Sequence, residues 1–223
     1  MNARVRMAAL TMVALGAAVE LTAQTRGPGT VAAHRPAFSG RMFGDAGLDR
    51  FAAPRSFNAI FGRDSGPVFG GGAEVVLGSN WFFRMGAWRF KKQGERAVRL
   101  DNQTFRLGIP LGVTITPIEA SGGYRFPIGA RQLFIAYAGG GVSSHRYSET
   151  SAFAEGDENL NERFTGYQVL GGVEYRLHRY VGLAGEVQYT TVPGALGAGG
   201  LSAEFDEDDL GGLIVRARLL FGR

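Results

Sequence analysis

Cysteine is absent from the 223 residues of the chain, and long hydrophobic runs are scarce. The missing thiols exclude a disulfide framework, a thiolate metal site, a cysteine nucleophile and a lipid anchor attached to cysteine. After residue 19 no continuous apolar run reaches the roughly 20 residues that a membrane-spanning helix needs. Because only helices and closed barrels satisfy their backbone polar groups in lipid, a membrane protein with this sequence has to be a β-barrel.

The N-terminal segment has the plan of a secretory signal peptide. Arg4 and Arg6 form a short basic region, and an apolar run over 7–19 follows that is shorter than a transmembrane helix. Ala23 precedes the polar Gln24, and we expect cleavage between them. The pattern therefore predicts export by a cleavable signal peptide.

Glycine is abundant, with 35 residues against a usual share of roughly 7 %, and it follows no Gly-X-Y period. This excess fits closely approaching strands and turns, and the chain length fits one β domain. We expect a signal peptide over 1–23, a disordered leader over 24–40 and one barrel domain over 41–223.

The clearest strand pattern runs from Thr165 to Tyr189. Alternate positions are apolar or aromatic, and the positions between them are small, polar or charged. Period-two alternation predicts two strands joined by a tight turn near His178 and Arg179. In a soluble sandwich the apolar face packs on a second sheet, whereas in an outer-membrane barrel it faces lipid.

Six further segments have strand patterns and bring the expected number to eight: 41–51, 67–78, 81–93, 111–126, 132–148 and 212–221. One of these patterns is irregular. Apolar residues from Leu107 to Ile115 keep one phase, and those from Ile118 to Phe126 keep the opposite phase. This slip predicts a bulge or break near Thr116 and Pro117. The pattern over 132–148 does not show which alternate residues face inward and which face outward.

The expected connections alternate between short turns, near 79, 127 and 178, and longer segments near 55, 100, 155 and 200. Short periplasmic turns and longer external loops are typical of outer-membrane barrels. The inward faces carry charges of both signs, which the apolar core of a soluble ligand-binding barrel does not accommodate. The sequence predicts an all-β fold, an eight-stranded antiparallel up-and-down transmembrane β-barrel. The expected inward charges are Glu74, Arg84, Glu119, Arg125, Glu174, Arg176, Glu186, Arg216 and Arg218.

Three stretches of sequence carry a family resemblance: Gly123-Tyr124-Arg125-Phe126-Pro127, the strand Ala136-Tyr137-Ala138-Gly139-Gly140-Gly141-Val142, and the terminal aromatic strand. Together with the strand number they resemble the small outer-membrane β-barrel proteins of the OmpA/OmpX-like class, over residues 40–223. The resemblance implies the outer membrane of a Gram-negative-type bacterium and insertion by the outer-membrane assembly machinery. It implies contact with outer-membrane lipid and lipopolysaccharide, and a monomer. The sequence has no phosphate-loop motif, zinc-site spacing or nucleic-acid-binding motif, so we expect no cofactor, no metal and no nucleic-acid partner. One departure is that Phe221 is followed by Gly222 and Arg223, where the family usually ends on an aromatic residue.

The inward charges admit two interpretations. An eight-stranded barrel is just wide enough for side chains, so opposite charges have to pair to offset their desolvation. The result is either an ion-pair network that plugs the lumen or a narrow gated pore. We expect the plugged barrel, with a structural or surface-interaction role in envelope integrity, adhesion or lipopolysaccharide contact.

Two sets of residues predict contacts with the membrane. Aromatic rings with a polar handle favour the headgroup region, which predicts a lipid-interface belt. Basic side chains at an outer surface can pair with lipopolysaccharide phosphates. The belt residues are Trp81, Tyr124, Phe126, Tyr175, Tyr180 and Phe221, and the basic residues are Lys91, Lys92, Arg96 and Arg99. Two acidic segments, 149–162 and 204–209, lack EF-hand spacing and read as solvated loops.

An enzyme is the third class to consider, because some eight-stranded barrels deacylate lipid A with a serine, a histidine and an acid on the barrel wall. Ser143 and His145 share a strand face here, and Glu149 is near them. A polar strand end that leaves the membrane has the same pattern. We therefore expect no catalytic residues.

Overall fold

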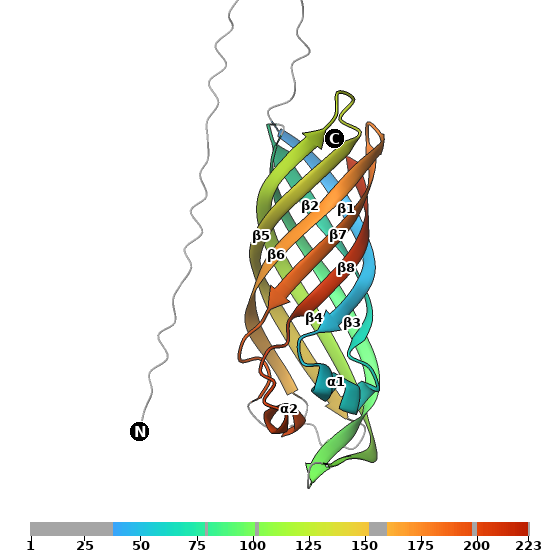
Figure 1. The fold of residues 1–223 in the computed structure, drawn as a ribbon, viewed down its shortest axis with the longest axis vertical. Helices are drawn as coiled ribbons and strands as arrows, with labels where there is room; N and C mark the ends of the chain where they lie inside the picture. The colour runs from blue at the N-terminus through green and yellow to red at the C-terminus, as the bar shows by residue number, and fades with distance from the viewer. Residues whose placement is uncertain (1–37, 79, 101–102, 152–159, 198–199, 223) are drawn as a thin grey trace, which may run out of the picture. The chain divides into compact units, whose positions relative to one another are not determined.

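The computed structural model describes residues 38–78, 80–100, 103–151, 160–197 and 200–222. Within them eight antiparallel strands close into a barrel, in which each strand pairs with its sequence neighbours and the last pairs with the first (Figure 1). The predicted eight-stranded up-and-down barrel is thereby confirmed. The strands are β1 (Phe38–Phe51), β2 (Ser65–Leu77), β3 (Trp81–Leu100), β4 (Gln103–Ile128), β5 (Phe134–Ser151), β6 (Leu160–His178), β7 (Val181–Thr191) and β8 (Gly212–Gly222).

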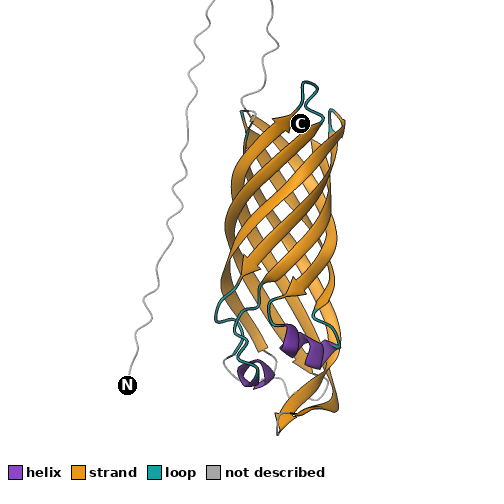
Figure 2. Cartoon of the chain, in the orientation of Figure 1, coloured by secondary structure: helices purple, strands orange, loops and turns teal. Residues whose placement is uncertain are grey.

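The two ends of the barrel differ. The short turns β2–β3, β4–β5 and β6–β7 lie at one end, here called the short-turn end. The opposite loop end carries two helices, α1 (Pro54–Phe61) and α2 (Gly200–Glu204), which Figure 2 shows beside the ends of the long strands. Neither helix, nor any other in the described part of the chain, has the length and apolar character to cross a membrane.

The predicted boundaries were wrong in three places. The longer connection expected near 100 is a two-stranded ribbon, because β3 and β4 stay paired to Leu100 and Gln103. The longer connection expected near 55 contains α1. β1 begins at Phe38, so the end of the predicted leader is strand, while the predicted signal peptide and residues 24–37 lie outside the described residues.

Strand β4 shows no bulge near Thr116 and Pro117. Its pairing with β5 runs without a shift from Leu111 to Ile128, and alternate side chains point inward throughout. The register shift between β3 and β4 lies elsewhere, between Glu95 and Ala97. The slip in the hydrophobic pattern therefore does not mark a backbone irregularity; it marks the place where the apolar side of the strand changes from inward to outward.

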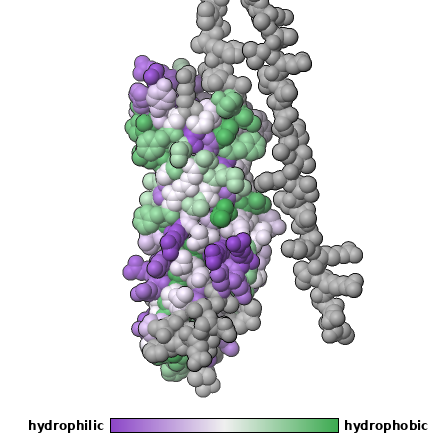
Figure 3. Space-filling view, turned by 180° about the vertical axis from the view of Figure 1, so that it is seen from behind, coloured by the Kyte–Doolittle hydropathy of each residue, from purple (hydrophilic) through white to green (hydrophobic). Residues whose placement is uncertain are grey.

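An apolar band encircles the half of the barrel near the short-turn end. Outward side chains there are large, hydrophobic and exposed, as at Met42, which is 70 % exposed. Figure 3 shows hydrophobic residues gathered over the upper half of one face and hydrophilic residues below them. The apolar band covers residues 42–48, 69–77, 81–85, 118–126, 134–142, 167–177, 183–189 and 213–221.

The parts of the strands on the loop-end side of the band, together with α1 and α2, are here called the loop-end extension. There the polarity of the outward and inward faces is reversed. Outward residues next to the band are polar, as at Arg89 and Gln93, and the inward ones pack into an apolar plug. The β3–β4 ribbon also exposes Val98, Phe105 and Leu107. Two aromatic contacts hold the plug together: the Phe51 and Phe57 rings stack with centroids 3.9 Å apart, and Phe90 meets Phe51 edge-on at 4.9 Å. The apolar plug consists of Phe51, Ala53, Phe57, Val68, Phe90, Leu111, Val113, Ile115, Tyr147, Val192, Leu210 and Ile214.

Candidate functional site

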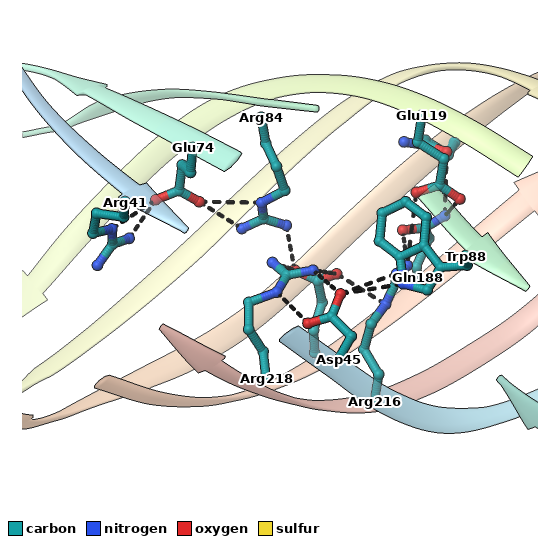
Figure 4. Close-up of polar contacts among 11 residues, drawn as sticks. Arg41, Asp45, Glu74, Arg84, Trp88, Glu119, Gln188, Arg216 and Arg218 are labelled. Atoms are coloured by element: carbon teal, nitrogen blue, oxygen red, sulfur yellow. Dashed lines mark hydrogen bonds and ion pairs between the residues drawn. The ribbon is translucent and has the colours of Figure 1, made fainter. Parts of the chain in front are cut away.

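The barrel interior at the level of the apolar band is filled by an ion-pair network (Figure 4). Arg218 donates from Nε and Nη2 to the two oxygens of Asp45, at 2.7 and 2.9 Å, and from Nη1 to Glu186 Oε2, at 2.9 Å. Arg84 donates from Nη1 to the same Glu186 oxygen, at 2.6 Å. Residues from β1, β3, β7 and β8 therefore meet on one carboxylate pair in the centre of the barrel.

The network continues toward the short-turn end. Arg84 also holds Glu74 Oε2 with Nε and Nη2, at 3.1 and 2.8 Å. Arg41 donates to Glu74 Oε1 and, from Nη1, to Glu174 Oε1 at 2.7 Å. Arg125 donates from Nη2 to Glu174 Oε2 at 2.9 Å. Each carboxylate bridges two arginines, so the chain of pairs is continuous from mouth to centre.

Toward the loop end, uncharged groups join the ion pairs, and Arg216 lies with its Nε 3.2 Å from Glu186 Oε1. Arg216 donates to Gln188 Oε1 and lies over the Trp88 ring, 4.4 Å from its centroid. Gln188 Nε2 in turn donates to Glu119 Oε1, at 2.9 Å. Trp88 Nε1 donates to Asp45 Oδ2 at 3.2 Å, which joins this layer to the central pair.

Burial makes this pairing obligatory. The space among the central side chains leaves no room for a water-sized sphere, and Arg218 is only 1 % exposed. An unpaired charge at such a depth costs several kcal/mol, roughly, so balanced signs are needed. The hydrogen-bonded network joins five cations (Arg41, Arg84, Arg125, Arg216 and Arg218) and five anions (Asp45, Glu74, Glu119, Glu174 and Glu186). Asp49 of β1 also points inward, and its buried Oδ1 has no hydrogen-bond partner among the described residues.

Eight of the nine predicted lumen charges lie in this network. The exception is Arg176, which lies at the rim with 43 % of its side chain exposed and Nε 4.0 Å from Glu174 Oε1. The prediction omitted Arg41 and Asp45. Both alternate with the outward residues of β1, such as Met42, so strand period alone would have placed them inside.

Glycines make room for the large inward rings. A Cβ on Gly86 would lie 2.7 Å from a ring atom of Trp88, and one on Gly123 would lie 2.7 Å from the Phe82 ring. Part of the high glycine content therefore provides the space into which the aromatic side chains of the lumen pack.

Helix α1 closes the plug and is held by a distant carboxylate. Glu207, from the β7–β8 loop, accepts hydrogen bonds from the backbone amides of Arg55 and Ser56, at 3.0 and 2.8 Å, and from Ser56 Oγ at 2.6 Å. These amides belong to the first turn of α1, where no helical partner exists. The prediction that segment 204–209 is solvated was wrong for Glu207, which is 8 % exposed, and for Asp209, which accepts from the amides of Val192 and Gly211 at 2.7 Å each.

Ser143 and His145 do share a face, as predicted, and that face is the lumen. Ser143 Oγ lies 2.9 Å from His145 Nε2, and both side chains are buried. Glu149 does not complete a triad, because its Oε2 accepts from Tyr147 OH at 3.1 Å. Burial raises the pKa of Tyr147, and the negative charge of Glu149 raises it further. Among the described residues no group of three or more His, Cys, Asp or Glu is placed to hold a metal ion.

The predicted basic residues lie on the β3–β4 ribbon. Lys91 points outward and is exposed. Lys92 points inward, where its Nζ lies 3.4 Å from Ser65 O and 5.3 Å from the centroid of the Phe61 ring. Desolvation lowers the pKa of Lys92. Arg99 donates to Glu204 O at 2.8 Å, so Lys92 and Arg99 both make contacts within the chain, while Arg96 is half-buried.

The predicted aromatic belt gathers at the short-turn end. Trp81 meets Tyr124 edge-on with centroids 5.2 Å apart, and Tyr124 lies 4.9 Å from Phe126. Tyr175, Tyr180 and Phe221 are also exposed there. A second set, at the loop-side edge of the apolar band, was not predicted and consists of Phe69, Tyr167 and Tyr189.

No protein-family model matches the sequence, and no curated protein matches it significantly. Solved structures do match, among them the N-terminal β-barrel domain of Pseudomonas aeruginosa OprF, with 11 % identity, a TM-score of 0.44, and 82 % of this chain and 97 % of that chain covered. The chain is similar in fold to small outer-membrane β-barrels. Neisserial surface protein A matches at 15 % identity and a TM-score of 0.45, over 83 % and 94 % of the two chains. Ail, the attachment invasion locus protein of Yersinia pestis, matches at 12 % identity and a TM-score of 0.47, with 82 % of this chain and 98 % of that chain covered. The likeness is one of fold and carries no activity with it.

Proposed function

We propose that the protein is an outer-membrane barrel with a closed lumen, which holds the loop-end extension above the membrane as a surface for structural or interaction roles. The observation that carries this proposal is the apolar band, present on all eight strands and backed by a charged interior. A soluble barrel with that outer surface would expose a large apolar patch, which monomeric soluble proteins avoid.

The dimensions of the band support a transmembrane location. Five of its eight segments span the roughly 9–11 residues that a tilted strand needs to cross a bilayer, and the other three are shorter. Short turns lie on the periplasmic side in barrels of this kind. The extension, with its polar outer face, would then project from the cell.

Fractionation tests the location. The full chain, expressed in a Gram-negative host, is expected in the outer-membrane fraction and to migrate faster on a gel when unheated than when boiled. A folded protein that remains soluble in the periplasm would contradict the proposal.

Closure of the lumen is tested by conductance. The ion-pair network and the apolar plug both obstruct the barrel, so the purified protein in planar bilayers is expected to show no steady current. A porin in the same bilayers gives the positive control. Steady opening would favour the alternative, a small gated pore.

Lipopolysaccharide contact is a second candidate role, favoured by one cross-strand pair. Arg146 on β5 and Arg163 on β6 lie directly opposite each other, and both point outward at the loop-side edge of the apolar band. Like charges in this position destabilise a sheet. A lipid A phosphate between them would relieve the repulsion, with the exposed Lys91 as a further contact on β3.

Paired substitution tests this role. Arg146→Ser with Arg163→Ser is expected to weaken lipid A binding to the reconstituted protein by at least about tenfold, because even one charge-assisted hydrogen bond contributes about 1.5–3 kcal/mol. Arg131→Ser, at the short-turn end, is the matched control. Equal lipid A binding by all three proteins would remove this role and leave the barrel proposal intact.

For catalysis we propose no role. The buried Ser143–His145 pair supports this, since a lipid on the outer wall has no path to it. Cells that express the protein are expected to keep full lipid A acylation, and a loss of acyl chains that depends on Ser143 would overturn the proposal.

A further inference from the structure

A hollow of about 320 Å³ opens at the short-turn end of the barrel. It lies over the last layer of the ion-pair network, and β1, β4, β6 and the β6–β7 turn contribute to its walls. Four guanidinium groups line it against a single carboxylate. The charged and titratable lining residues are Arg41, Arg125, Glu174, Arg176, His178 and Arg179.

The carboxylate of Glu174 is already occupied. Its Oε1 accepts from Arg41 at 2.7 Å and its Oε2 accepts from Arg125 at 2.9 Å. Arg176 comes no closer than 4.0 Å to it. Arg179 lies over the Tyr180 ring, 4.6 Å from the centroid, and has no carboxylate within 4.0 Å among the described residues. The buried network balances its charges, whereas the hollow above it retains two surplus cations.

One donor at the hollow is also unsatisfied. Arg125 is 4 % exposed, and its Nε has no hydrogen-bond partner within the described part of the chain. A buried donor without an acceptor is costly, by roughly 1–3 kcal/mol. Arg125 lines the hollow, so an oxyanion there would neutralise the surplus charge next to this buried guanidinium.

We propose that this hollow is a phosphate-binding site, in which Arg176 and Arg179 contact the phosphate oxygens from the rim and Arg125 from the wall. Guanidinium groups match the geometry of phosphate oxygens and bind them in a bidentate manner. The phosphate is either soluble or the headgroup of a lipid in the adjacent leaflet. The site requires only the barrel fold and does not depend on the role of the extension.

The test uses the full chain, reconstituted in nanodiscs of a phosphate-free galactolipid and titrated with inorganic phosphate at constant ionic strength. Binding is followed by the line width of the free phosphate signal in ³¹P NMR. Saturable broadening is expected, and Arg176→Gln with Arg179→Gln is expected to weaken it by about tenfold or more, since two charge-assisted contacts are lost. Both residues are exposed, so the variant should fold, which gel mobility before and after heating verifies.

Arg131→Gln is the matched control, because Arg131 is exposed at the same end of the barrel and does not line the hollow. It should bind phosphate as the parent protein does. Nanodiscs that contain phosphatidic acid distinguish the sources: competition with soluble phosphate would assign the site to the lipid headgroup, and its absence to soluble phosphate. No saturable broadening in a correctly folded protein, or equal binding by the double variant, would overturn the site and leave the proposed function untouched.

Discussion

Strand β3 passes through two regions with opposite interiors. Within the apolar band its inward Arg84 joins the ion-pair network while the neighbouring Met85 faces outward. Within the loop-end extension its inward Phe90 joins the apolar plug while Gln93 faces outward. The backbone ladder is the same in both, so the strand does not set the polarity. The surroundings proposed for each region, lipid in one and water in the other, account for the reversal.

The two interiors also depend on different forces. In the network, directional contacts between charges hold side chains from several strands, and the removal of one partner leaves another charge buried. In the plug, apolar side chains pack without directional bonds, and helix α1 is joined to them by the carboxylate of Glu207. The network should therefore respond to substitution as a unit, and the extension should respond locally.

The largest effect is expected from breaking the network. Arg218→Met leaves Asp45 and Glu186 without their central partner and should lower the free energy of unfolding by about 3–5 kcal/mol, measured by urea titration in lipid vesicles. Arg50→Met is the matched change in the extension. Arg50 forms an ion pair with Asp64 at 3.0 Å, and 72 % of the Arg50 side chain is exposed. The substitution should therefore lower the free energy of unfolding by only about 0–1 kcal/mol. Equal losses for the two variants would contradict the comparison.

A smaller effect is expected from placing a charge on the outer wall. Met85→Arg puts a cation in the apolar band, opposite Ala73 at the middle of the β2 segment, and should cost about 2–4 kcal/mol in a bilayer. Gln93→Arg, eight residues further along β3 and also outward, should change stability by less than about 0.5 kcal/mol. The same vesicle titration measures both. If both substitutions were neutral, the band would not face lipid.

Much of the fold was predictable because most strands have one apolar face. On β6, β7 and β8 the alternation predicted the outward residues, as at Val187 and Leu219, which are exposed. On β4 the same signal failed, since Leu111 to Ile115 and Ile118 to Phe126 are apolar on opposite sides of an unbroken strand. Periodicity reports which side is apolar and not which medium surrounds it. A strand that passes from one medium to another therefore shows the same break in its hydrophobic pattern as a strand with a bulge.

The sequence predicted which charged residues point into the barrel, but not which of them contact one another. Eight inward charges followed from strand period, but the partner of each depends on closure of the barrel. Arg218 and Asp45 are 173 positions apart in the chain and meet only because β8 pairs with β1. The bond between Ser56 and Glu207, across 151 positions, joins two loops whose sequences show no pairing signal. Such contacts are properties of the closed structure and are invisible to local patterns.

The smallest effect is expected at the joint between the two loops. Glu207→Gln keeps the shape of the side chain and removes the charge that accepts from the first turn of α1, which should cost about 1 kcal/mol. Because α1 belongs to the extension, the loss should appear as faster hydrogen exchange at the amides of Ser56 and Phe57, with unchanged urea unfolding of the barrel. Glu204→Gln, in the same loop and exposed, should leave exchange unchanged. A fall in barrel stability equal to the local loss would show that the extension and the ion-paired segment unfold together, and the contrast between a cooperative network and a locally responding plug would then be wrong.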